Sequence, residues 1–119
     1  MTHGTRAVVA FVVKSLFANR TGEVICDVVF DKRIRITGQV DGDGISLFDH
    51  DRGCQISGVW NRSHVTLYDH GSYCHLSIHV SGNRFEGYDY ATNSYFGGEW
   101  NDAGVMIYDL SEGGSFRYS

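Results

Sequence analysis

The chain lacks several features that mark common classes of protein. Its 119 residues include no proline and only three cysteines, Cys26, Cys54 and Cys74. An odd number of cysteines without a regular spacing excludes a disulfide framework of the secreted type, so we expect reduced thiols and a cytoplasmic location. The longest apolar run, residues 7–13, is far shorter than the roughly 20 residues that span a bilayer. A membrane is therefore not an expected partner.

Positive charge is also scarce. Ten Lys and Arg residues stand against 14 Asp and Glu residues, and the formal net charge is −4. Proteins that bind nucleic acid present a basic face to the phosphates, so nucleic acid is not an expected partner. The hydrophobic fraction of 42% is too high for a disordered chain, and the length suits one core. We expect a single domain over residues 1–119 and no cofactor.

Glycine, by contrast, is abundant, with 15 residues, and the chain repeats itself every 20 residues. An aromatic residue followed by Asp recurs at this step, at 48–49, 68–69, 88–89 and 108–109. A second series with the same step carries Val40, Trp60, Val80 and Trp100. Each unit holds two short runs of alternating apolar and polar residues, separated by clusters of Gly, Asn, Asp and Ser. This arrangement is typical of strands joined by tight turns, and it predicts one β-hairpin per repeat.

The hairpins predict an all-β fold over residues 23–119, with residues 23–30 and Asp31 as a degenerate first copy. Two architectures accommodate such a repeat: an antiparallel meander of about ten strands that curls into a closed or nearly closed barrel, and a β-solenoid with one coil per repeat. In a solenoid the Asp column would stack at about 4.8 Å, which is repulsive without a cation. In a meander the Asp residues lie two strands apart, and we therefore favour the meander and the barrel.

Turn lengths set the register of the hairpins and thereby the face on which each side chain lies. Four-residue loops at 50–53 and 61–64 pair Asp49 with Cys54 and Trp60 with Val65. The core face then carries the aliphatic residues, and the aromatic column lies on the opposite face. Three glycines point into the core, where they would relieve crowding as the strands curve: Gly38, Gly58 and Gly98. Cys54 and Cys74 lie two strands apart, so we expect buried thiols that do not pair.

The N-terminal segment, residues 1–22, lacks this alternation. Residues 6–18 predict a short helix that ends at 19–22 with Gly22 as its C-terminal cap, and the four valines leave a strand as the alternative. A helix that is apolar on every side has to be buried. We expect it to pack against the mouth of the barrel or in a subunit interface.

The repeated polar and aromatic columns supply the candidate sites. An Asp at a strand end usually accepts hydrogen bonds from turn N–H groups, so we interpret four residues as structural turn carboxylates: Asp49, Asp69, Asp89 and Asp109. The aromatic column faces water and needs a cover, which the N-terminal segment, a second subunit or a ligand would provide. Candidate ligand-binding or interface residues are Phe48, Tyr68, Tyr88, Tyr108, Trp60, Trp100 and His75. Tyrosine suits carbohydrate or protein recognition because its ring is flat and apolar and its tip is polar.

No metal site is expected. His75 and His79 share a face but lie about 13 Å apart along a strand, and no spacing of Cys and His matches a zinc site. Four carboxylates at one end of the barrel leave a cation site as the lesser alternative for the Asp column.

Equivalent surface chemistry in every repeat favours a non-enzymatic ligand-binding or self-assembling β-barrel module. Its partners would be a small molecule or carbohydrate, or further copies of the chain. The alternative is a small barrel enzyme that uses a His–Asp acid–base pair at the barrel mouth. No nucleophile motif is present, and no catalytic residue is assigned.

Overall fold

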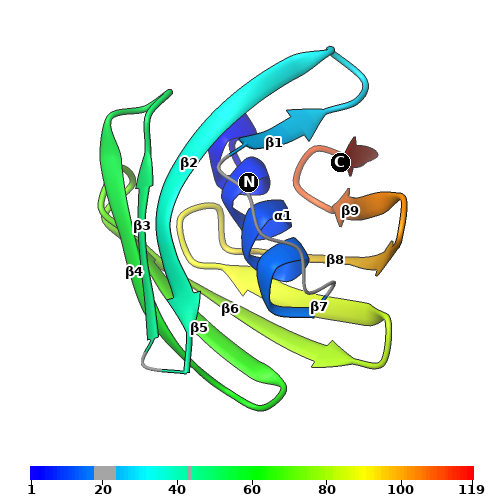
Figure 1. The fold of residues 1–119 in the computed structure, drawn as a ribbon. Helices are drawn as coiled ribbons and strands as arrows, with labels where there is room; N and C mark the ends of the chain where they lie inside the picture. Colours follow the sequence, from blue (N-terminus) through cyan, green and yellow to red (C-terminus); the bar gives the residue numbers. More distant parts are fainter. Residues whose placement is uncertain (18–23, 43) are drawn as a thin grey trace.

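The computed structural model describes residues 1–17, 24–42 and 44–119, and it forms a closed β-barrel around one helix (Figure 1). The elements are α1 (His3–Phe17), β1 (Val24–Asp27), β2 (Lys32–Asp41), β3 (Gly44–Asp49), β4 (Cys54–Asn61), β5 (His64–Asp69), β6 (Cys74–Ser81), β7 (Arg84–Asp89), β8 (Ser94–Asn101), β9 (Gly104–Asp109) and β10 (Gly114–Tyr118). Each strand pairs antiparallel with the next, and β1 pairs with β10. The predicted hairpin meander and barrel are confirmed.

The register of the hairpins is also as predicted. Asp49 pairs with Cys54 across β3 and β4, and Trp60 pairs with Val65 across β4 and β5. Inward positions of the strands are filled by buried aliphatic side chains such as Leu47, Ile56 and Leu67. Because side chains alternate between the two faces of a strand, the residues between these lie on the outer face.

The location of α1 differs from our expectation. The helix runs through the interior of the barrel instead of packing at its mouth or in a subunit interface (Figure 1). All seven residues of the run 7–13 are buried within one core that they share with the strands. A barrel of ten strands encloses more space than side chains alone can fill, and an apolar helix fills it. The strand alternative for this segment is wrong, and the predicted end at 19–22 lies outside the described residues.

Glycines on the inner face bring neighbouring strands close to one another. A Cβ atom at Gly58 would overlap the carbonyl oxygen of Thr66, and one at Gly98 would overlap that of Met106. The repeat position of Gly38, Gly58 and Gly98 is occupied by Ile78 in the third repeat. There Gly87, which pairs with Ile78, allows the close approach of the strands. The inward glycines therefore permit the strands to curve tightly around α1.

The barrel closes at its shortest seam. One residue pair, Asp27 and Tyr118, is in register between β1 and β10, whereas the other strand pairs are in register over four to six residues. Backbone hydrogen bonds from Cys26 to Ser119, from Ser119 to Cys26 and from Val28 to Arg117 complete the seam.

The three cysteines are free, as predicted, but they are half-buried instead of fully buried. Burial raises the pKa of the Cys54 thiol more than the nearby Arg52 lowers it, so this thiol stays protonated at neutral pH. Within the described ranges, no helix has the length and apolar character needed to cross a membrane.

Candidate functional site

Two regions of the barrel carry clustered polar or aromatic side chains, and the first is the mouth around the start of α1. Five buried Asp residues end the strands there: Asp27, Asp49, Asp69, Asp89 and Asp109. In each, Oδ1 accepts a hydrogen bond from the backbone N–H two residues further on, at 2.8–3.1 Å. The fifth carboxylate is Asp27, which the sequence pattern had not placed in the column because its spacing is 22 residues and not 20.

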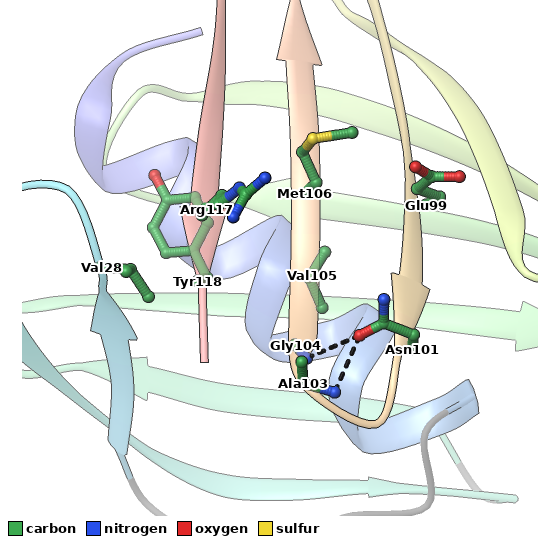
Figure 2. Close-up of a pocket in the computed structure, with 9 residues that line it drawn as sticks. All are labelled: Val28, Glu99, Asn101, Ala103, Gly104, Val105, Met106, Arg117 and Tyr118. Carbon is green, nitrogen blue, oxygen red and sulfur yellow. Dashed lines mark hydrogen bonds between the residues drawn. The ribbon is translucent and has the colours of Figure 1, made fainter.

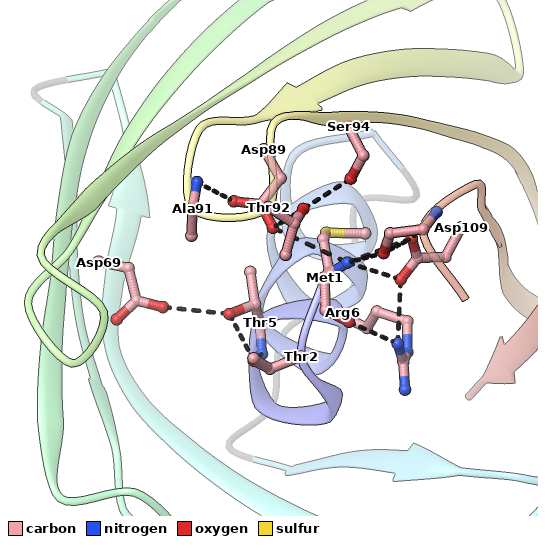
Figure 3. A network of polar contacts seen from close by, with 11 residues as sticks. Met1, Thr2, Thr5, Arg6, Asp69, Asp89, Ala91, Thr92, Ser94 and Asp109 are labelled. Carbon is pink, nitrogen blue, oxygen red and sulfur yellow. Dashed lines mark hydrogen bonds and ion pairs between the residues drawn. The ribbon is translucent and has the colours of Figure 1, made fainter.

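The second carboxylate oxygens of Asp69, Asp89 and Asp109 turn toward the start of α1 (Figure 3). Arg6 donates to Oδ2 of Asp109 at 3.0 Å, and the hydroxyl of Thr5 lies 3.4 Å from Oδ2 of Asp69. The first turn of α1 contains no acidic residue of its own. The strands therefore supply the negative charge that the positive end of the helix dipole favours.

Arg52 joins two members of this group. Its Nε donates to Asp49 at 2.7 Å and its Nη1 donates to Asp69 at 2.9 Å. Burial opposes the charge of Arg52, but the two carboxylates outweigh burial and raise its pKa. At Asp109 burial acts to raise the pKa, and hydrogen bonds from the Met1 amino group, Ser111 and Arg6 outweigh it, so the pKa of Asp109 is lowered. The Asp109 carboxylate is therefore charged and paired at neutral pH.

A His–Asp pair does occur at the mouth. Nδ1 of His3 lies 3.6 Å from Oδ2 of Asp27, and the His3 ring packs edge-on against Phe30. A substrate would need space beside this pair, but α1 occupies the interior. Neither of the two hollows described below is lined by His3 or Asp27.

The second region is the outer face, where rings gather in three clusters. We call these residues the aromatic belt: Phe48, His50, Tyr68, His70, His75, Tyr88, Tyr90 and Tyr95. In each of the first three repeats the column residue contacts the ring two positions later, with centroids 4.8–4.9 Å apart. Tyr68 and Tyr88 also contact a ring on the next strand, His75 and Tyr95 respectively, at 4.8 Å. The belt is not covered by α1, which lies inside the barrel.

A hollow of about 470 Å³ lies between the second and third clusters. Its lining includes the rings of Tyr73 and Tyr90, both largely exposed, together with His75. Thr66 and Ser77, which pair across β5 and β6, add two hydroxyl groups. The volume is within the range of small-molecule sites, and the lining combines flat apolar rings with a few hydrogen-bonding groups.

Tyr73 has an unusual backbone for a large residue. Its φ is +57°, and the equivalent turn positions with positive φ are Asp31, Gly53, Asn93 and Gly113. A left-handed backbone costs a non-glycine L-residue about 1–2 kcal/mol, and Asp, Asn and Gly bear this cost best. The Tyr73 side chain is 77% exposed, so burial does not offset the strain. Strain that packing does not explain is a reason to look for a function at this residue.

The second hollow lies on the outer face beside the seam and encloses about 350 Å³ (Figure 2). Arg117, Met106 and Glu99 lie in register across β10, β9 and β8, and all three line it. Asn101 closes the nearby turn by accepting hydrogen bonds from Ala103 and Gly104. The lining of this hollow contains the carboxylate of Glu99, the guanidinium of Arg117 and the thioether of Met106. Tyr118 is its single aromatic residue.

The predicted site residues therefore separate into two groups. Tyr68, Tyr88 and His75 lie on the belt beside the first hollow, and Phe48 and Tyr108 lie on the same outer face further round the barrel. Trp60 and Trp100 lie on inward positions and pack against the core, where the Trp60 indole N–H donates to the carbonyl of Asp41 at 2.6 Å. The structure does not bring the two tryptophans and the tyrosine column together.

Sequence reasoning missed Tyr73 and Tyr90, which form the walls of the hollow. Both lie in turns, where side-chain alternation does not indicate which way a ring points. The signal available was Tyr73 itself, a bulky residue at the turn position where other repeats carry Gly or Asn. Among the described residues, no group of three or more His, Cys, Asp or Glu is arranged to hold a metal ion.

Comparisons of the chain with protein-family models, with curated proteins and with solved structures find no match. Its function is therefore inferred from its own residues.

Proposed function

We propose that the chain is a non-enzymatic binding module that takes a carbohydrate in the outer hollow between Tyr73 and Tyr90. The single observation that carries this proposal is Tyr73, which holds an exposed ring on a strained left-handed backbone at the rim of that hollow. The rings of Tyr73 and Tyr90 offer apolar faces for the C–H surfaces of a sugar. His75, Thr66 and Ser77 offer hydrogen bonds to its hydroxyl groups.

The proposal is tested by screening the protein against an array of neutral and charged glycans and measuring the best glycan by calorimetry. Tyr73→Asn places at this turn the residue that the next repeat uses, Asn93. We expect it to weaken binding by about tenfold or more, because a stacking ring is lost. We expect the free energy of unfolding to stay the same or to rise by up to about 1 kcal/mol, because Asn tolerates this backbone better.

The matched control is Tyr108→Ala. Tyr108 lies on the same outer face but does not line the hollow, so its removal should leave binding unchanged. The absence of any glycan ligand, or equal binding by the wild type and Tyr73→Asn, would reject the carbohydrate site.

Self-association is the second candidate. Large apolar side chains stay exposed outside the hollow, among them Phe48 on the belt and three consecutive residues of the first turn, Val28, Val29 and Phe30. Exposed apolar patches commonly mark protein contacts. Size-exclusion chromatography with light scattering over a hundredfold range of concentration tests this directly. A dimer that Phe48→Ser or Phe30→Ser dissociates would support self-association, and a strict monomer would reject it.

A further inference from the structure

We propose that His64 and His79 form a binding site for a divalent transition-metal ion, with Zn²⁺ as the reference ion, on the outer face of β5 and β6. The two residues are directly opposite each other in the antiparallel register, and both are exposed. Their rings lie side by side, with centroids 5.2 Å apart and planes 41° apart. Imidazole nitrogen is a preferred ligand of Zn²⁺, Ni²⁺ and Cu²⁺.

The spacing of the two rings matches shared coordination. With metal–nitrogen distances of 2.0–2.1 Å and tetrahedral angles, two imidazoles on one ion have ring centres roughly 5 Å apart. The observed centroid separation of 5.2 Å agrees with this value. Since both residues are exposed, water can complete the coordination sphere.

A carboxylate lies next in the same row. Glu86 of β7 is directly opposite His79, so the order across three adjacent strands is His64, His79, Glu86. Residues directly opposite in antiparallel strands have Cβ atoms about 4.5–5.5 Å apart, so Glu86 lies beside the histidine pair without forming a three-ligand cluster with it. Its negative charge favours a cation there, although Arg84 on the same face of β7 competes for that charge.

The pair belongs to neither region described above. It lies on the outer face, away from the buried carboxylates of the mouth, and neither histidine lines the hollow between Tyr73 and Tyr90. The pair does not follow from alternation within one strand, because its two members lie on neighbouring strands. Continuing the register from Asp69 and Cys74 places His64 opposite His79.

The test is calorimetric titration of the tag-free protein with Zn²⁺ alone, together with the visible absorption of bound Co²⁺. We expect His79→Gln and His64→Gln each to lower Zn²⁺ affinity by about tenfold or more, because half of the histidine donors are lost. Glu86→Gln should lower the affinity by a smaller factor. His75→Gln is the matched control, since His75 lies on the same face of β6 and contacts Tyr68 instead.

Circular dichroism of each variant checks that the fold is retained, as expected for exposed positions. Loss of affinity in the His64 and His79 variants with none in the His75 variant supports the site. No Zn²⁺ binding by the wild type, or equal affinity of the wild type and His79→Gln, overturns it. Because the probe is the metal alone, either result leaves the carbohydrate proposal to its own test.

Discussion

Each turn at the mouth contains one position with a left-handed backbone, and the residue at that position differs between repeats. The backbone is left-handed there in every repeat, and the chain places Asp31, Gly53, Tyr73, Asn93 and Gly113 at it. Asp, Gly and Asn satisfy the turn at low conformational cost. Tyrosine does not, and its ring is the most exposed of the large apolar side chains. The exception therefore carries more information about function than the repeat does.

The inward glycines are predicted to be required by close strand packing. In Gly98→Ala the new Cβ would overlap the carbonyl oxygen of Met106 and press on the Phe85 ring. We expect the free energy of unfolding to fall by about 1–3 kcal/mol, as in other overpacked cores. Gly42→Ala is the control, because a Cβ there meets no atom within 4 Å. Equal stability of the two variants in urea unfolding would contradict the packing role of Gly98.

Arg52 is predicted to stabilise the mouth of the barrel by bridging Asp49 and Asp69. Arg52→Met leaves the buried carboxylates of Asp49 and Asp69 without their cation. Breaking such a pair from one side costs on the order of 3 kcal/mol, so the midpoint of urea unfolding should fall clearly. Arg84→Met removes an exposed arginine of β7 and should change the midpoint little. If both variants unfold alike, the bridge at Arg52 contributes nothing to stability.

At the scale of elements, the hairpins could be predicted closely and the helix only in part. Alternation of side chains and four-residue turns set both the strands and their register, because one face of each strand is buried. The all-round apolar character of residues 7–13 indicated a buried helix. Its place inside the barrel could not be read from local pattern, because the width of the interior depends on how all ten strands close.

The candidate site was less predictable than the fold. Alternation along the strands predicts that the side chains of Tyr68, Tyr88 and His75 face outward. All three lie beside the hollow. Tyr73 and Tyr90 come from turns, where alternation gives no information about side-chain direction. The inward position of Trp60 and Trp100, which are half-buried against the core, follows from the alternation that also sets the register.

The helix is predicted to contribute to stability as the centre of the core. Phe11→Ala removes a ring that is 6% exposed within the barrel, and we expect a loss of about 3–5 kcal/mol in the free energy of unfolding. Phe30→Ala removes the same group from a turn where it is 67% exposed, and it should cost less than about 0.5 kcal/mol. Thermal unfolding of the two variants measures the effect of the same Phe→Ala change at a buried and at an exposed site. A small effect of Phe11→Ala would contradict the packing of α1 inside the barrel.

At the scale of the whole molecule, the barrel closes around α1, so its interior is filled by the core and contributes to stability. The core is continuous from the helix to the strands, and the carboxylates at the mouth are paired with groups of the chain itself. Exposed rings and the hydroxyl groups of Thr66 and Ser77 gather on the outer face. The outer face is therefore where we place recognition.

Stability is predicted to fall at both ends of the pH range. The pKa of Asp109 is lowered in the fold, so its contribution is complete above its unfolded pKa of about 4 and is lost as the pH falls below it. Burial raises the pKa of Tyr118 to about 12, although Arg6 acts against this. Its contribution is complete below the unfolded pKa of about 10 and is lost between pH 10 and 12. Urea unfolding from pH 3 to 12 measures both changes.

Tyr118→Phe supplies the control for the alkaline change. The variant has no phenol to ionise, so its stability should fall less steeply than that of the wild type between pH 10 and 12. Parallel curves for the two proteins would show that Tyr118 is not the group responsible.

The central claim is that a filled barrel recognises its ligand on the outside, and one nuclear magnetic resonance titration tests it most directly. Backbone and side-chain shifts of the labelled protein are followed as the best glycan from the array is added. We predict saturable changes at Tyr73, His75 and Tyr90, and none along α1. Shift changes centred on α1 and the mouth, with the outer hollow unaffected, would contradict the claim.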